Sequence, residues 1–170
     1  MNKGILNISF DTELGWGAIE NGLWLDRERK GVYESVRDKI ARVIELSDSL
    51  DFPCSWGFVG KMIDEQSDGP VIPRKEIVYA LRTGKKSSFY GQDILESVIN
   101  ARVSHEIAWH TYYHIRFDSP DIDEDYVKQD FDKASQLQAR YGITINSIIF
   151  PQNIEGYLNL TADSFKFFRA

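Results

Sequence analysis

The amino-acid sequence predicts an α/β protein built on a mostly parallel sheet. Short apolar runs of strand length alternate with longer segments whose apolar residues recur at helical spacing. This alternation is typical of βαβ units, in which a helix connects two parallel strands. An open doubly wound sheet and a (β/α) barrel both fit the pattern, and in both the functional site lies at the carboxyl ends of the strands.

The expected strands are apolar runs bounded by glycine, proline or polar residues. They cover residues 5–11, 54–59, 105–109, 143–150 and 165–168. The expected helices cover residues 33–50, 75–81, 92–101 and 158–163, together with a long helix that Ser119 or Asp121 caps and that ends before Gly142. Residues 64–74, with a turn at Asp68-Gly69-Pro70, and residues 83–88 are expected to be loops.

Length and composition limit the class of protein. A chain of 170 residues is expected to be a single domain, residues 1–170, or part of one, and it can bury a substantial core. The net charge of −6 and the pI near 5.1 argue against a nucleic-acid partner. The single cysteine, Cys54, excludes an internal disulfide, and no stretch is long enough to cross a bilayer. With no secretory signal expected, the chain is predicted to be cytoplasmic.

Two carboxylates follow the first expected strand in the motif S-F-D-T-E, residues 9–13. Because side chains alternate along a strand, Asp11 and Glu13 are expected to point to the same side while Thr12 points to the other. One carboxylate could bind a metal ion while the other takes a proton from water. Such a pair also occurs at strand ends as an ordinary loop start or helix cap.

Two imidazoles follow the third expected strand in the motif H-T-Y-Y-H, residues 110–114. If this segment turns helically, His110 and His114 share a face and can both reach one ion at about 2.0–2.1 Å. Two histidines and one carboxylate leave coordination positions open for water and substrate, as a catalytic site requires. The third histidine, His105, begins the strand out of step with His110, which favours a structural hydrogen bond. Trp16, near the acidic motif, could line a substrate cleft or pack in the core.

The two motifs together resemble those of a known family. S-F-D-T-E, followed by H-E-I-A-W-H-T-Y-Y-H, is similar to the first two motifs of the polysaccharide deacetylases, the NodB-type carbohydrate esterases. F-P-C-S-W-G-F-V-G, residues 52–60, is similar to the family's second strand. The resemblance implies a distorted (β/α) barrel that uses a divalent metal, usually zinc, to hydrolyse an N- or O-acetyl group on a sugar.

The resemblance also assigns roles to individual residues. It matches Asp11 to the catalytic base, and His110 and His114 to two metal ligands. The family's usual third ligand is an aspartate at the position of Thr12, so Glu13 is expected to serve as that ligand here.

The sequence departs from the family pattern at two points. An arginine that orients the base is expected two residues before Pro151, where this chain has Ile149; Pro151 and Asn153 match the surrounding loop and are candidate substrate contacts. The family's general acid is a late histidine, and no histidine follows His114. These departures lead us to expect the N-terminal portion of a longer barrel, incomplete at its C-terminus.

The leading hypothesis is therefore a metal-dependent hydrolase, with zinc as the expected metal, that deacetylates an N-acetylated sugar or a glycan precursor. Two alternatives remain open. One is a non-catalytic sugar-binding module with the same fold, and the other is a different barrel amidohydrolase that cleaves a cyclic amide. The sequence leaves the oligomeric state open.

Overall fold

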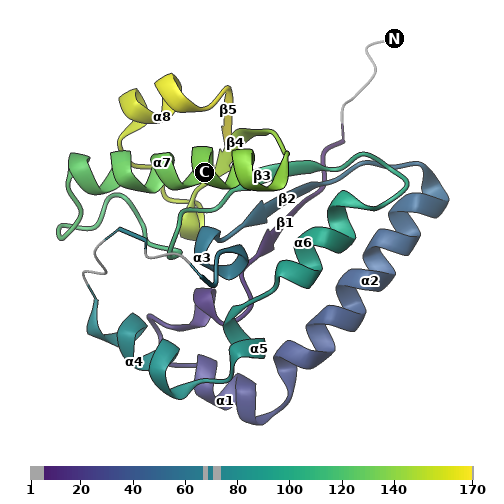
Figure 1. Cartoon of the computed structure of the whole chain (residues 1–170), viewed down its shortest axis with the longest axis horizontal. Coiled ribbons are helices and arrows are strands. Elements are labelled where there is room, and N and C mark those ends of the chain that lie inside the picture. The colour runs from purple at the N-terminus through teal and green to yellow at the C-terminus, as the bar shows by residue number, and fades with distance from the viewer. Residues whose placement is uncertain (1–5, 67–68, 71–73, 170) are drawn as a thin grey trace.

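The computed structural model describes residues 6–66, 69–70 and 74–169. Within them, five strands form one parallel sheet in chain order, β1-β2-β3-β4-β5 (Figure 1). The strands are β1 (Ser9–Thr12), β2 (Ser55–Phe58), β3 (Glu106–Trp109), β4 (Ile145–Ile149) and β5 (Phe167–Arg169). A doubly wound sheet reverses its order at a switch point, whereas here each strand is added to the same side of the one before. The fold is a partial (β/α) barrel.

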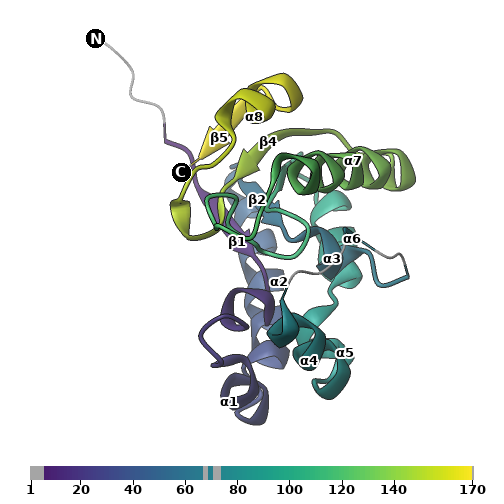
Figure 2. The same cartoon turned by 90° about the vertical axis from the view of Figure 1, so that its left-hand side faces the viewer.

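Helices of very different lengths connect the strands. Their bounds are η1 (Trp16–Ala18), α1 (Trp24–Arg29), α2 (Val32–Leu50), α3 (Gly60–Ile63), α4 (Lys75–Thr83), α5 (Lys86–Phe89), α6 (Gln92–Ile99), α7 (Glu124–Tyr141), η2 (Pro151–Asn153) and α8 (Leu158–Ser164). Figures 1 and 2 show α7 and α8 beside β4 and β5, while α1, α4 and α5 lie together at the other end of the molecule. In the described part of the chain, no helix combines the length and apolar character needed to cross a membrane.

The two faces of the sheet carry different side chains. One face presents Phe10, Trp56 and Ile148 to the apolar core, which the inward faces of the longer helices complete. The opposite face carries polar groups: Glu106 accepts hydrogen bonds from the hydroxyl of Ser55 and, at 2.7 Å, from that of Ser147. Alternate residues of each strand point to opposite sides of the sheet, so one side is apolar and the other carries polar residues.

Most expected elements are confirmed, with shifted ends. The structure contains strands and helices in all the expected places, but β1 begins only at Ser9, and Ile5 and Asp68 of the expected first strand and turn lie outside the described residues. The expected loop at 83–88 is wrong in part, because α5 begins at Lys86.

The expected cap of the long helix is also wrong. Asp123 is the N-cap of α7, and its carboxylate accepts a hydrogen bond of 2.8 Å from the backbone N–H of Tyr126. Neither Ser119 nor Asp121 takes that place; Asp121 instead binds Arg74. At the other end, Gly142 has a φ of 63°, as expected for the residue that ends a helix.

Candidate metal centre

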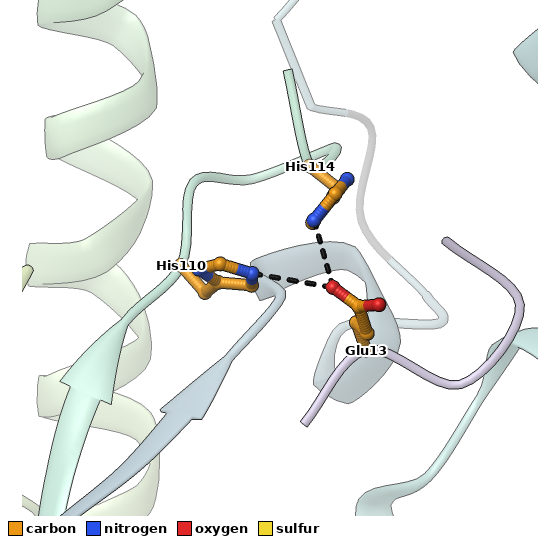
Figure 3. A group of neighbouring side chains, drawn as sticks. All are labelled: Glu13, His110 and His114. Carbon is orange, nitrogen blue, oxygen red and sulfur yellow. Dashed lines mark hydrogen bonds and ion pairs between the residues drawn. The ribbon is translucent and has the colours of Figure 1, made fainter. Parts of the chain in front are cut away.

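Glu13, His110 and His114 converge on one point beyond the carboxyl ends of β1 and β3. The Nε2 atom of His114 lies 2.8 Å from Oε2 of Glu13, and Nε2 of His110 lies 3.4 Å from the same oxygen. Figure 3 shows both rings directed at this carboxylate, which comes from the other motif. One donor atom from each of the three residues lies within 4.8 Å of the other two. The structure thus brings the two motifs together although they are 97 residues apart.

The histidine segment is a bend and not a helical turn, so the two rings meet without sharing the face of a helix. Residues 110–116 contain no helix, and Thr111 and His114 have positive φ values of 54° and 58°. Such left-handed conformations are costly for residues other than glycine, so surrounding contacts must hold them. The backbone N–H groups of Gly60 and Lys61 provide two such contacts by donating to the carbonyls of Thr111 and Tyr112, at 3.0 and 2.8 Å.

Glu13 lies in the turn after β1, so strand alternation does not place it. The strand ends at Thr12, and Leu14 has a φ of 44°, which turns the chain. The carboxylate then rests directly on Gly17, where a Cβ atom would lie 1.9 Å from Oε1 of Glu13. Any side chain at position 17 would displace this carboxylate, so the glycine makes room for the site.

Hydrogen bonds fix the protonation and orientation of the centre. The Nδ1 atom of His110 lies 2.7 Å from the carbonyl oxygen of Ile149. Because a carbonyl only accepts, Nδ1 donates to it and carries a proton, which leaves Nε2 as the ring nitrogen that faces Glu13. Burial opposes ionisation of Glu13, but its hydrogen bonds with His110 and His114 outweigh burial and lower its pKa to about 2. Glu13 is therefore a carboxylate at neutral pH.

This donor set fits a divalent metal ion. Two imidazole nitrogens and a carboxylate oxygen are the ligands of many catalytic zinc sites. His110 is fully buried, whereas the side chain of Glu13 is 29% exposed, so the centre has protein on one side and solvent on the other. Such a site leaves positions open for water and substrate.

Asp11 is held separately, by an arginine that the sequence did not indicate. A guanidinium nitrogen of Arg169 on β5 binds Oδ1 of Asp11, and a second nitrogen donates to the hydroxyl of Ser9 at 2.6 Å. In the sheet, Arg169 is the register partner of Ile149, the position at which the family resemblance places an arginine. The positive charge thus comes from the neighbouring strand. The 158 residues between Asp11 and Arg169 explain why no local motif could reveal the pair.

The remaining predicted residues lie in different settings. Trp16 is 1% exposed, and its indole N–H donates to the carbonyl of Phe89 at 2.7 Å, so it packs in the core and does not line an open cleft. Pro151 is buried and Asn153 exposed in η2, beyond the carboxyl end of β4. His105 accepts a hydrogen bond of 3.1 Å from the backbone N–H of Cys54 at the opposite end of β3, which confirms its structural role.

Comparison with known proteins adds evidence on the fold. The crystal structure of a Mycobacterium smegmatis protein assigned as a polysaccharide deacetylase superimposes with a TM-score of 0.59 and 16% sequence identity. The likeness is one of fold. It covers 95% of this chain and 49% of the other, so the chain spans about half the length of that structure. No protein-family model and no curated protein matches the sequence.

Proposed function

We propose that this chain is a metal-dependent hydrolase that removes an acetyl group from an N-acetylated sugar or a glycan precursor. The observation that carries the proposal is the convergence of Glu13, His110 and His114 at the carboxyl edge of a parallel sheet. Ligands bind at this edge in barrels of parallel strands. The fold shared with a protein assigned as a polysaccharide deacetylase supports the choice of substrate.

The residues divide the chemical work between them. Glu13, His110 and His114 would hold the metal, and zinc suits this set of donors. When bound, such an ion polarises an acyl carbonyl and lowers the pKa of a bound water to about 7. Asp11 would act as the base, and Arg169 would keep its carboxylate oriented.

Asp11 alone can carry out both proton transfers that the reaction needs. Water attacks the acetyl carbon and gives one proton to Asp11; the bond from that carbon to the sugar nitrogen then breaks, and Asp11 returns the proton to the departing amine. None of the chain's three histidines is placed to act as the acid, since two belong to the metal centre and His105 lies at the far end of β3. Asp11 therefore serves as base and then as acid in this scheme.

An acetate-release assay tests the proposal. The chain is supplied with Zn²⁺ and a panel of N- and O-acetylated sugars, and wild type is compared with Asp11→Asn. Loss of the base is expected to lower the rate by about 10²–10⁴-fold while metal content stays at wild-type level. Asp26→Asn is the matched control, because Asp26 is exposed and its ion pair is with Lys30 on the same helical turn.

Two outcomes would contradict the assignment. Equal acetate release by wild type and Asp11→Asn would show that Asp11 is not the base. Stoichiometric metal binding without acetate release from any substrate of the panel would favour a sugar-binding module of the same fold.

A further inference from the structure

A single buried carboxylate on α7 holds the bend that carries the two histidines. The side chain of Asp130 is completely buried. Its Oδ1 accepts a hydrogen bond from the indole N–H of Trp109, and its Oδ2 accepts one from the backbone N–H of Tyr112, both at 2.6 Å. These two donors lie on either side of His110 in the chain. One carboxylate therefore spans the segment that contains the first histidine.

The bond to Tyr112 acts where the backbone is strained. Thr111, directly before it, has a φ of 54°, and this reversal turns the chain toward His114. From α3, the backbone N–H groups of Gly60 and Lys61 donate to the carbonyls of Thr111 and Tyr112. From the α7 side, Asp130 binds the N–H of Tyr112. The peptide groups of the bend are thus held by two helices, α3 and α7, and such surrounding contacts allow a left-handed residue other than glycine to persist in a folded protein.

A buried carboxylate is a costly way to stabilise a core. Removing the charge from water opposes folding, and the charge-assisted hydrogen bonds at best roughly balance that cost. An amide or apolar side chain of similar size would fill the same volume without burying a charge. What these cannot do is accept a hydrogen bond at both of the positions that Trp109 and Tyr112 present.

We infer that Asp130 is a positioning residue of the metal centre, which sets the bend so that His110 and His114 both present Nε2 to Glu13. The inference rests on the proposed function in its use of a metal ion, but it concerns a residue that touches neither ion nor substrate. The ring centroids of the two histidines lie 4.8 Å apart, and this spacing depends on the bend.

Metal affinity of the chain in the variant Asp130→Asn tests the inference. The asparagine retains the shape and one acceptor, but its NH₂ group cannot accept the second hydrogen bond. We expect Zn²⁺ and Co²⁺ to bind about 10–100-fold more weakly, as is typical when a residue that orients a metal ligand is changed. The visible absorption of the Co²⁺ form should also change, since it reports ligand geometry, whereas the thermal midpoint of the metal-free chain should not fall.

Matched variants separate positioning from general damage. Asp132→Asn makes the same chemical change at an exposed position of α7 and should leave the Co²⁺ spectrum unchanged. Trp109→Phe removes the donor to Oδ1, together with part of a buried ring, and should give an intermediate loss of affinity. Wild-type affinity and spectrum in Asp130→Asn would overturn the inference.

A metal-independent measurement keeps this test distinct from that of the proposed function. Nitrogen-15 spectra of the imidazoles report whether Nδ1 of His110 carries the proton that the carbonyl of Ile149 accepts. If wild type binds no metal, the proposed function fails, yet loss of this tautomer preference in Asp130→Asn would still support positioning by Asp130. An unchanged His110 signal in that variant would contradict it.

Discussion

Gly17 is the residue whose missing side chain matters most to the candidate site. The Glu13 carboxylate occupies the space where a Cβ would stand, and this carboxylate is the flexible end of a long side chain. A methyl group at position 17 can therefore be accommodated by turning Glu13 away. The fold would be retained and the ligand lost.

We accordingly expect Gly17→Ala to weaken Zn²⁺ binding by at least about 10-fold while the free energy of unfolding changes by less than about 1 kcal/mol. Isothermal titration and urea unfolding measure the two quantities. Gly142→Ala should give the reverse pattern, because φ is 63° there, nothing lies near the new methyl group, and the position ends α7 away from the site. Strong metal binding by Gly17→Ala would show that Glu13 is not a ligand.

Asp130 also gives the protein a specific dependence of stability on pH. Burial raises its pKa to about 7, against the opposing effect of the hydrogen bonds from Tyr112 and Trp109. Because the pKa is raised above the ordinary value of 3.8, the folded state binds the proton more tightly than the unfolded state. Its contribution to stability is complete below about pH 4 and is lost as the pH rises through about 7.

For the metal-free chain, Asp130→Asn should therefore gain stability relative to wild type between pH 5 and pH 8. The change is on the order of 3 kcal/mol, from about 1.4 kcal/mol for each pH unit between pH 5 and the raised pKa of about 7. Urea unfolding in the presence of a chelator measures it, with Asp132→Asn as the control that should parallel wild type. A constant difference between Asp130→Asn and wild type at both pH values would contradict the raised pKa.

At the scale of elements, α7 depends on a cap that sequence inspection misplaced. Ser119, Asp121 and Asp123 are all residue types that cap helices, and they lie within five positions, so composition alone does not choose among them. The structure chooses Asp123, which has extended backbone angles and a side chain within reach of Tyr126. Asp121 is engaged by Arg74 from a distant part of the chain.

Asp123→Ala is expected to cost about 1 kcal/mol of unfolding free energy, the usual contribution of an N-cap side chain. For a chain of this size that corresponds to a fall of about 2–4 °C in the thermal midpoint. Ser119→Ala is the comparison, since it removes the hydroxyl of the rejected cap. Equal effects of the two substitutions would argue against Asp123 as the cap.

The sequence predicts the elements whose apolar residues recur with a clear helical period, and it does not predict those that depend on distant contacts. α2 and the later part of α7 have long apolar stripes, and their bounds agree closely with the expected ones. The four-residue helices α3 and α5 have no room for a period. The spacing of His110 and His114 is compatible with a helical turn and does not reveal the bend, in which Asp130, 18 residues further along, accepts a hydrogen bond from the backbone N–H of Tyr112.

The same distinction applies to the site residues. Glu13, His110 and His114 could be chosen because polar residues at the carboxyl ends of parallel strands meet at one edge. Arg169 and Gly17 could not be chosen in this way. Arg169 on β5 binds a residue of β1, with three strands between them in the sheet order, and Gly17 matters because it has no Cβ atom. Strand alternation does not account for the place of Glu13, which lies just past the last strand residue, although Glu13 does lie close to His110 and His114.

At the scale of the whole molecule, a metal at the candidate centre would link the first strand to the third. An ion that binds only the folded state stabilises it, by about 2.7 kcal/mol at a free concentration 100 times the dissociation constant. We expect Zn²⁺ at that excess to raise the thermal midpoint by about 5–10 °C. His110→Ala and His114→Ala should each abolish most of this increase. An equal increase in wild type and both variants would place the bound metal elsewhere.

The order of the strands has a consequence for how the protein is made. Since every strand pairs with its predecessor, the sheet can grow one strand at a time as the polypeptide leaves the ribosome, without waiting for a distant partner. The candidate centre cannot follow that schedule, because Glu13 is synthesised 97 residues before the first imidazole it meets. During synthesis its carboxylate therefore lacks both rings until the third strand has joined, so a metal ion at the candidate centre could be bound only after that strand is in place.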